Sequence, residues 1–258
     1  MTKQNGSKLQ KLLATWPAGT VYTTSWLEAK GYSRFLLNQY RTSEWLKAVG
    51  RGAVARAGDK LDWLGGLYAL QSQLKLPIHV GGKTALGRQG SAHFLGLGKE
   101  AVTLFAAPGT RLPSWFTAHD WNVQINFYTT NLFSRQLGFQ TENVGTFSIM
   151  LSSRERSMFE LLYLAPQSQS LEEAKLIMGS LTNLRPQVVQ SLLEDCSSIK
   201  VKRLFMLLAE GLNMPWVKRL NLEKVDFGTG ARTLIKGGKT HPKYLLTVPA
   251  ELFGEAEQ

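Results

Sequence analysis

The spacing of apolar residues changes three times along the chain. Up to about residue 75 it is mostly helical, with apolar side chains every three or four positions. Residues 76–151 instead contain short apolar runs between glycine- and proline-rich turns, which is typical of strands. Helical spacing returns over residues 152–220, and strand-like runs follow over residues 221–249. The pattern predicts an α+β fold that begins with helices.

The first helix is expected over residues 8–16, with Leu9, Leu12 and Leu13 on one face. A second helix is expected to begin at Ser25. Ser25 and Glu28 have the S-x-x-E spacing of a capping box, in which the two side chains satisfy free backbone N–H groups. The first helix would then support the pair of helices that follows it.

A sharp turn and a third helix come next. Gly31 permits the turn, and Ser33 is placed to cap a helix of about nine residues. Such a helix is roughly 13 Å long, which is short enough to lie in the major groove of DNA. The two helices therefore have the order of a helix-turn-helix.

Three polar side chains of this third helix share one face. Arg34, Asn38 and Arg41 are spaced four and three residues apart. Arginine and asparagine suit paired hydrogen bonds to guanine and adenine edges, so these three are predicted to meet base edges or adjacent phosphates. Three apolar neighbours are expected to pack inward: Phe35, Leu36 and Tyr40.

A β-hairpin is predicted after the third helix. WLKAV and AVARA read as two short strands around Gly50-Arg51-Gly52, which places Arg51 at the tip, near a phosphate or the minor groove. This order predicts a winged helix-turn-helix that binds DNA. The residues predicted to contact the DNA backbone are Ser33, Gln39, Thr42, Lys47, Arg51 and Arg56. The alternative is a helical hairpin with a solvated polar face.

We assign residues 1–60 to the winged helix-turn-helix and residues 61–258 to an α+β domain with a mixed sheet. A helix from near Asp62 to before Pro77 joins them, so the boundary is not sharp. The strands expected near the end of the chain are KVDFG, ARTLIKGG and KYLLTVP.

The helices after residue 151 carry start signals and one basic set. Ser152 with Glu155 and Ser170 with Glu173 repeat the capping-box spacing, and Pro186 suits a first helical turn. A later helix has a stripe expected to be buried, formed by Val201, Leu204, Phe205 and Leu208. A basic set is expected beside that stripe and outside it: Lys200, Lys202 and Arg203.

The net charge of +11 is concentrated at the start of the 258-residue chain. Residues 1–80 hold 11 Lys or Arg against 4 Asp or Glu, a net charge of +7, whereas residues 81–150 and 151–258 carry +2 each. The basic excess therefore coincides with the predicted winged helix, as expected of a module that binds phosphates.

Catalytic, metal and cofactor sites are not expected. GGKT occurs at 81–84 and 237–240, but a phosphate-binding P-loop needs glycine where Pro77 and Thr233 stand, and neither copy is expected to open a long helix after a strand. The four histidines have no partner at metal-ligand spacing, and His119-Asp120 lacks a G-x-S-x-G nucleophile motif.

Three glutamates, Glu142, Glu155 and Glu160, form no recognisable nuclease cluster, and the latter two are attributed to capping and solvation. Cys196 is the single cysteine, so an internal disulfide is excluded, and a packing role is expected for it. No apolar stretch approaches eighteen residues and the chain starts without a signal-peptide pattern, so we expect a cytoplasmic protein without a membrane partner.

The order of several segments resembles the AbiEi family, the antitoxin components of type IV toxin–antitoxin systems. The segments are SWLEAKGYSRFLLNQY, SEWLKAVGRGAVARAGD and LDWLGGLYALQSQLKLPIHVGGKTAL. Four later segments resemble the carboxy-terminal part of the family: LPSWF, SSRERSMFELL, LLEDCSSIKVKRLF and KYLLTVP. The resemblance covers nearly the whole chain.

The resemblance implies a non-enzymatic repressor that binds inverted repeats of double-stranded DNA in its own promoter. We expect a monomer in solution that pairs on the DNA. By position, the recognition helix falls on 33–42 and the wing on 45–57, and Glu44 stands where the family leads us to expect glycine. The resemblance also implies a partner, a nucleotidyltransferase-like toxin. Lys200, Lys202 and Arg203 are candidate contacts for it.

Two other interpretations stay open from the residues. The chain can be a plain winged-helix regulator whose second domain senses a ligand or dimerises. Alternatively, residues 76–258 can hold a divergent DNA-targeted nuclease, which a metal-dependent cleavage assay would reveal.

Overall fold

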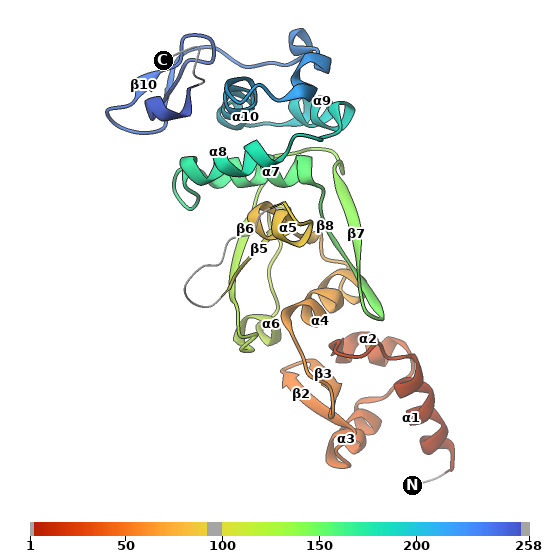
Figure 1. Cartoon of the computed structure of the whole chain (residues 1–258). Coiled ribbons are helices and arrows are strands. Elements are labelled where there is room, and N and C mark those ends of the chain that lie inside the picture. Colours follow the sequence, from red (N-terminus) through yellow and green to blue (C-terminus); the bar gives the residue numbers. More distant parts are fainter. Residues whose placement is uncertain (1–2, 92–99, 254–258) are drawn as a thin grey trace.

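The computed structural model describes residues 3–91 and 100–253. Figure 1 shows the helices and hairpin of the first sixty residues at one end, a sheet in the middle, and a group of helices beyond it. A small sheet lies at the opposite end. The predicted α+β fold class and the amino-terminal helix-turn-helix with strands are confirmed.

The amino-terminal unit has the order expected of a winged helix. Its elements are α1 (Lys3–Thr15), β1 (Tyr22–Thr23), α2 (Thr24–Ala29), α3 (Arg34–Thr42), β2 (Leu46–Gly50) and β3 (Ala53–Arg56). The strands pair antiparallel in the order β1-β3-β2. Leu9 and Leu12 of α1 and Trp16, which follows the helix, pack with Leu27 of α2 and Tyr40 of α3 in one apolar core.

Two local predictions in this unit are wrong. Ser25 does not begin α2, because Thr23 is the capping residue and its hydroxyl accepts a hydrogen bond from the Trp26 N–H at 3.4 Å. Phe35 does not pack inward, since its side chain is 73 % exposed. At about 100° per residue, Phe35 points away from its buried neighbour Leu36.

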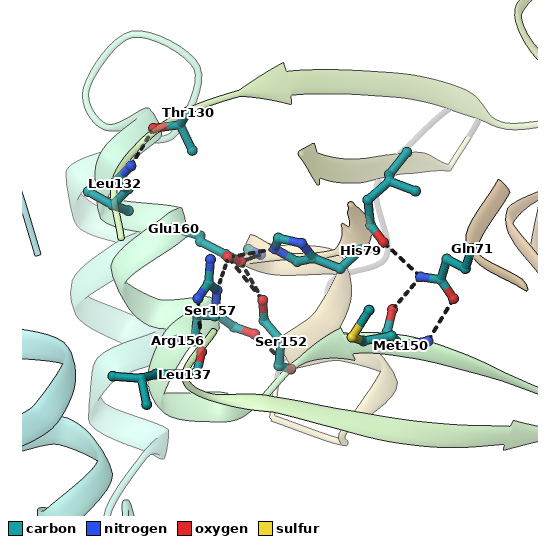
Figure 2. Close-up of polar contacts among 12 residues, drawn as sticks. Gln71, His79, Thr130, Leu132, Leu137, Met150, Ser152, Arg156, Ser157 and Glu160 are labelled. Atoms are coloured by element: carbon teal, nitrogen blue, oxygen red, sulfur yellow. Dashed lines mark hydrogen bonds and ion pairs between the residues drawn. The ribbon is translucent and has the colours of Figure 1, made fainter. Parts of the chain in front are cut away.

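A helix with an irregular second half joins the two parts of the chain. Asp62 caps α4 (Trp63–Tyr68), which continues as a π-helical turn, η1 (Ala69–Gln73). The side chain of Gln73 bonds the backbone of Val21 and Thr23 at the edge of the winged sheet. The Gln71 amide is hydrogen-bonded to the backbone of Ile78 and of Met150 in the next sheet, and Figure 2 shows its contacts with Met150. The π-helical turn therefore places two amides between the two sheets.

The central sheet is mixed, as predicted. Its strands are β4 (Ile78–Val80), β5 (Ala101–Ala106), β6 (Gln124–Thr129), β7 (Phe139–Val144) and β8 (Phe147–Ser152), in the order β6-β5-β4-β8-β7. β4 is parallel to β8 and β5 is parallel to β6, while the other neighbours are antiparallel. Two short helices accompany the sheet, α5 (Gly82–Arg88) and α6 (Ser114–Ala118).

The helices predicted after residue 151 are α7 (Arg154–Leu164), α8 (Leu171–Ser180), α9 (Pro186–Asp195) and α10 (Ile199–Gly211). Ser170 caps α8 and Pro186 begins α9, as predicted. The expected capping box at Ser152 is wrong, because Ser152 ends β8 and Ser153 precedes α7. A further apolar core surrounds α7 and α10.

The end of the described chain is less regular than predicted. Its elements are η2 (Pro215–Arg219), η3 (Leu222–Lys224), β9 (Arg232–Thr233), β10 (Lys239–Thr240), β11 (Leu246–Val248) and η4 (Ala250–Leu252). KVDFG (224–228) is not a strand: Lys224 ends a 3₁₀ turn and an Asp226 carboxylate accepts the Gly228 N–H at 2.7 Å.

The winged unit packs closely on the following part of the chain. The glycine at position 50, in β2, lies so near Trp115 of α6 that a β-carbon there would stand 2.9 Å from the Trp115 backbone. Val21 and Ala53 belong to the apolar core that contains Trp63 and Trp115. The division of the chain near residue 60 stays a prediction, and this packing extends across it.

Candidate nucleic-acid interface

Helix α3 presents a polar face that its own sequence orients. Ser33 caps the helix as predicted, because its hydroxyl accepts a hydrogen bond from the Leu36 N–H at 3.3 Å. Leu36, Leu37 and Tyr40 are buried and define the inward direction. At about 100° per residue, the outward direction then falls on three positions. They are Asn38, Thr42 and Phe35, all exposed.

The arginines of α3 lie on one flank of that outward face. Arg41 is exposed. The side chain of Arg34 is 87 % exposed, and its Nε donates to the Glu28 carboxylate of α2 at 2.7 Å. This hydrogen bond raises the pKa of Arg34. The helix thus offers an amide at its centre and two guanidinium groups beside it.

The other two polar positions of α3 are more constrained. The hydroxyl of Thr42 donates to the Asn38 carbonyl at 3.0 Å, so it has only its lone pairs left to offer. Gln39 is half-buried on the opposite flank, and within the described residues its Oε1 is buried without a hydrogen-bond partner. Gln39 is therefore the least accessible of the α3 candidates.

The wing holds Arg51 at its tip. Arg51 is exposed in the turn between β2 and β3, and Gly52 has a φ of +90°, which favours glycine. The Thr24 N–H donates to the Gly52 carbonyl at 2.9 Å, which ties this turn to the start of α2. Arg51 is therefore carried by a fixed loop beside the helix pair.

Lys47 and Arg56 are placed differently from Arg51. Both are half-buried: Lys47 Nζ donates to the Asp59 carbonyl at 2.6 Å, and Arg56 bonds the Asp59 carboxylate at 3.0–3.2 Å. The same carboxylate accepts the Gly19 N–H at 2.7 Å. These two cations fasten the hairpin to the chain that leaves it.

The basic set on α10, Lys200, Lys202 and Arg203, does not form the exposed surface that the sequence predicts. Lys202 and Arg203 are buried, with 4 % and 2 % exposed. Arg203 donates to the carbonyls of Phe227, Gly228 and Gly230, and Lys200 Nζ donates to carbonyls at the end of α7. The expectation that they lie outside the buried region is wrong, because loop carbonyls cover this side of α10.

A buried polar centre lies between the sheet and α7, and sequence reasoning missed it. Figure 2 shows the Glu160 carboxylate accepting hydrogen bonds from His79, Ser152 and Arg156, at 2.8–2.9 Å. It also accepts the Gly82 N–H at 3.2 Å. Burial opposes the charge, but His79 and Arg156 outweigh it and hold the pKa of Glu160 below its usual value. The expectation that Glu160 is solvated is wrong.

This polar centre also bears on whether the first GGKT segment, at 81–84, can bind a phosphate. The segment does follow a strand, β4, but as expected it opens no long helix, because α5 has only seven residues. However, Glu160 already occupies the amide of Gly82, and Lys83 bonds Glu173 at 2.5 Å. A phosphate at this position would meet a buried carboxylate. The sequence signal for the centre was the i,i+4 spacing of Arg156 and Glu160.

A cavity of about 550 Å³ opens beside α6 and β6. Its lining includes Arg111, Phe116, His119, Trp121 and Phe127. Trp115, next to Phe116 in α6, packs against β2 of the winged unit.

Three further observations concern the described part of the chain. Within residues 3–91 and 100–253, no group of three His, Cys, Asp or Glu side chains is arranged to hold a metal ion. Cys196 is buried, and burial raises the pKa of its thiol to about 11. None of the helices described is long and apolar enough to cross a membrane.

Comparison with family models assigns both parts of the chain. Residues 5–97 match the amino-terminal domain of the AbiEi antitoxin transcriptional regulators, and residues 99–249 match the regulator of that description from type IV toxin–antitoxin systems. The chain belongs to the AbiEi antitoxin family. The predicted resemblance is thus confirmed, and the AbiEi antitoxins are transcriptional regulators by description.

A solved structure shares the fold of this chain. The structure of the RV2827C protein from Mycobacterium tuberculosis matches with a TM-score of 0.57 at 15 % identity, over 95 % of this chain and 92 % of that chain. At this identity the likeness concerns the fold alone. No curated protein sequence matches the chain.

Proposed function

We propose that this AbiEi protein represses its own operon by binding inverted repeats in the promoter and also opposes a nucleotidyltransferase-like toxin. The observation that carries the proposal is the outward face of α3, with Asn38 at its centre and Arg34 and Arg41 on one flank. An asparagine amide can bond adenine at two atoms, and arginine can do the same with guanine. The family description supports the regulatory role.

In this proposal α3 lies in the major groove and the wing lies along the backbone. Arg34, Asn38 and Arg41 meet base edges or the phosphates beside them. Ser33, Thr42 and Arg51 position the helix, and Gln39 has a smaller part because it is half-buried. Lys47 and Arg56 act through Asp59 by holding the hairpin in place. Two protomers on an inverted repeat would read equivalent half-sites.

The first test is binding of the full chain to a fragment from upstream of its own gene. Specific binding that is lost on a scrambled fragment is expected. Arg34→Ala and Asn38→Ala should each lose discrimination at one base pair, whereas Arg51→Ala should weaken binding to all sequences similarly. A uniform loss for all three variants would contradict the assignment of α3 as the reading helix.

The second test separates neutralisation of the toxin from binding to the promoter. A variant with Arg34→Ala, Asn38→Ala and Arg51→Ala changes exposed residues only, so it should fold. Expressed from an unrelated promoter together with the partner toxin, it should still rescue growth although it no longer binds the operator. If it folds but gives no rescue, antitoxicity depends on DNA binding and the proposed division of roles is wrong.

The cavity beside α6 favours a second candidate, a regulator whose DNA affinity responds to a small molecule. A ligand against Phe116 would lie one residue from Trp115, which packs on the wing. Phe116→Trp should partly fill the cavity, so a small molecule that alters operator binding should lose its effect in this variant. A cleavage assay on the same fragments in the presence of a divalent metal ion tests the alternative that the chain is a nuclease.

A further inference from the structure

Phe35 is an apolar side chain that does not pack in any of the described apolar cores. It is 73 % exposed on α3, while Leu36, Leu37 and Tyr40 of the same helix are buried. Exposing a phenylalanine forgoes the stabilisation that burial would give, and the helix already has its inward stripe. Phe35 therefore lies on the face opposite the core, beside Asn38 and Thr42.

The surroundings of Phe35 indicate what can cover it. Arg34 precedes it directly and Arg41 lies on the same helix, both exposed, and the first 80 residues carry a charge of +7. A second copy of the chain docking through this face would bring like charges together, which is unfavourable. A polyanion that also exposes an apolar group would complement both the ring and the arginines.

We propose that Phe35 contacts the 5-methyl group of a thymine in the major groove, next to the base pair that Asn38 reads. The thymine methyl is the apolar group on the major-groove edges of the bases, and phenylalanine is among the side chains that contact it. Asn38 follows Phe35 by three residues, so their β-carbons are about 5–6 Å apart, a distance that spans one or two base-pair steps. The inference rests on the proposed function and adds thymine to the half-site.

The experiment removes the methyl group from the DNA and the ring from the protein. The promoter fragment is amplified with either dTTP or dUTP, because uracil pairs like thymine but lacks the methyl. The wild-type chain should bind the uracil fragment about fourfold more weakly per half-site. This is the change in affinity that corresponds to the free energy of burying one methylene group. Phe35→Ala should bind both fragments equally, and Phe35→Leu should keep part of the difference.

A matched control variant comes from the opposite part of the chain. Leu176 of α8 is also apolar and 69 % exposed, so Leu176→Ala should keep the full difference between the thymine and uracil fragments. Unchanged thermal unfolding of Phe35→Ala shows that the variant is folded, as an exposed position predicts.

Several results would overturn the inference. Equal binding of both fragments by the wild-type chain removes the methyl contact, and a full uracil effect in Phe35→Ala assigns it to another side chain. If Phe35→Ala instead changes only the association of two copies, measured by sedimentation, the ring serves a protein contact. Failure to distinguish the promoter from scrambled DNA would refute the proposed function itself, and with it the contact.

Discussion

The salt dependence of operator binding follows from which cations α3 and the wing leave exposed. Arg34, Arg41 and Arg51 are exposed, and the ion pair of Arg34 with Glu28 lies at the surface, where such pairs are weak. Lys47 and Arg56 are half-buried and bonded to Asp59. We therefore expect three cations per protomer to displace counterions from the DNA.

The magnitude can be worked out from this count. Two protomers on an inverted repeat would neutralise about six phosphates, which gives a slope of log K against log salt of about −5 at roughly −0.9 per phosphate. Binding should then weaken about a thousandfold between about 50 and 200 mM salt. Arg51→Ala should remove one contact per protomer and reduce the slope to between about −3 and −4.

Fluorescence anisotropy of a labelled promoter fragment, titrated at five salt concentrations, measures the slope. Lys47→Ala is the matched control, because it removes the same charge from the same hairpin but from a bonded, half-buried side chain. It should leave the slope unchanged and lower the unfolding temperature instead. An unchanged slope in Arg51→Ala, or an equal decrease in both variants, would refute this reasoning.

Three further predictions address the reading face, a strained residue and pH. Asn38→Ala should lose about 1–3 kcal/mol of discrimination at one base pair, which mobility shifts on single-base variants of the operator measure. Equal weakening of binding to all of these variants would contradict this prediction. Glu44 has a φ of +58°, so Glu44→Gly should relieve backbone strain and raise the free energy of unfolding by about 0.5–1 kcal/mol. The Tm should rise by about 1–2 °C, and a lower Tm would contradict the strain. Burial opposes the charge of Glu155, but hydrogen bonds from Arg185 and Ser153 lower its pKa to about 2. The resulting stabilisation is present above its unfolded value of 4.5 and is lost as the pH falls toward 2. Since the Arg185 side chain is 62 % exposed, we expect the pair of Glu155 and Arg185 to contribute only about 1–2 kcal/mol to the free energy of unfolding. Denaturant unfolding of Arg185→Ala at several pH values should show that this pH dependence is lost. An unchanged dependence would exclude the Glu155–Arg185 pair as its source.

The winged unit was predictable because its signals are local. Ser33 caps α3, Gly52 allows the wing turn, and Glu44 stands at a positive φ where the family led us to expect glycine. The mixed sheet and the helices that follow it were also predictable from changes in apolar spacing. Capping was less predictable, because Thr23 and Ser153 each lie close in sequence to the serine that was expected to cap.

The errors concern residues whose surroundings come from distant parts of the chain. Arg203 is covered by carbonyls of residues 227–230, and Glu160 is bonded to His79, 81 positions earlier. Helical spacing cannot place such partners, so buried charged groups were read as surface groups. Phe35 is the opposite case, because it is apolar and yet exposed: its angle around α3 places it away from the buried side chains of Leu36, Leu37 and Tyr40.

Selection of bound sequences from random duplexes would show directly what the outward face of α3 reads. We expect the full-length wild-type chain to enrich an inverted repeat that occurs upstream of its own gene, and Asn38→Ala to lose one position of each half-site. Enrichment of no sequence, or of a repeat absent from that promoter, would contradict the claim that the outward face of α3 reads the operator of its own operon.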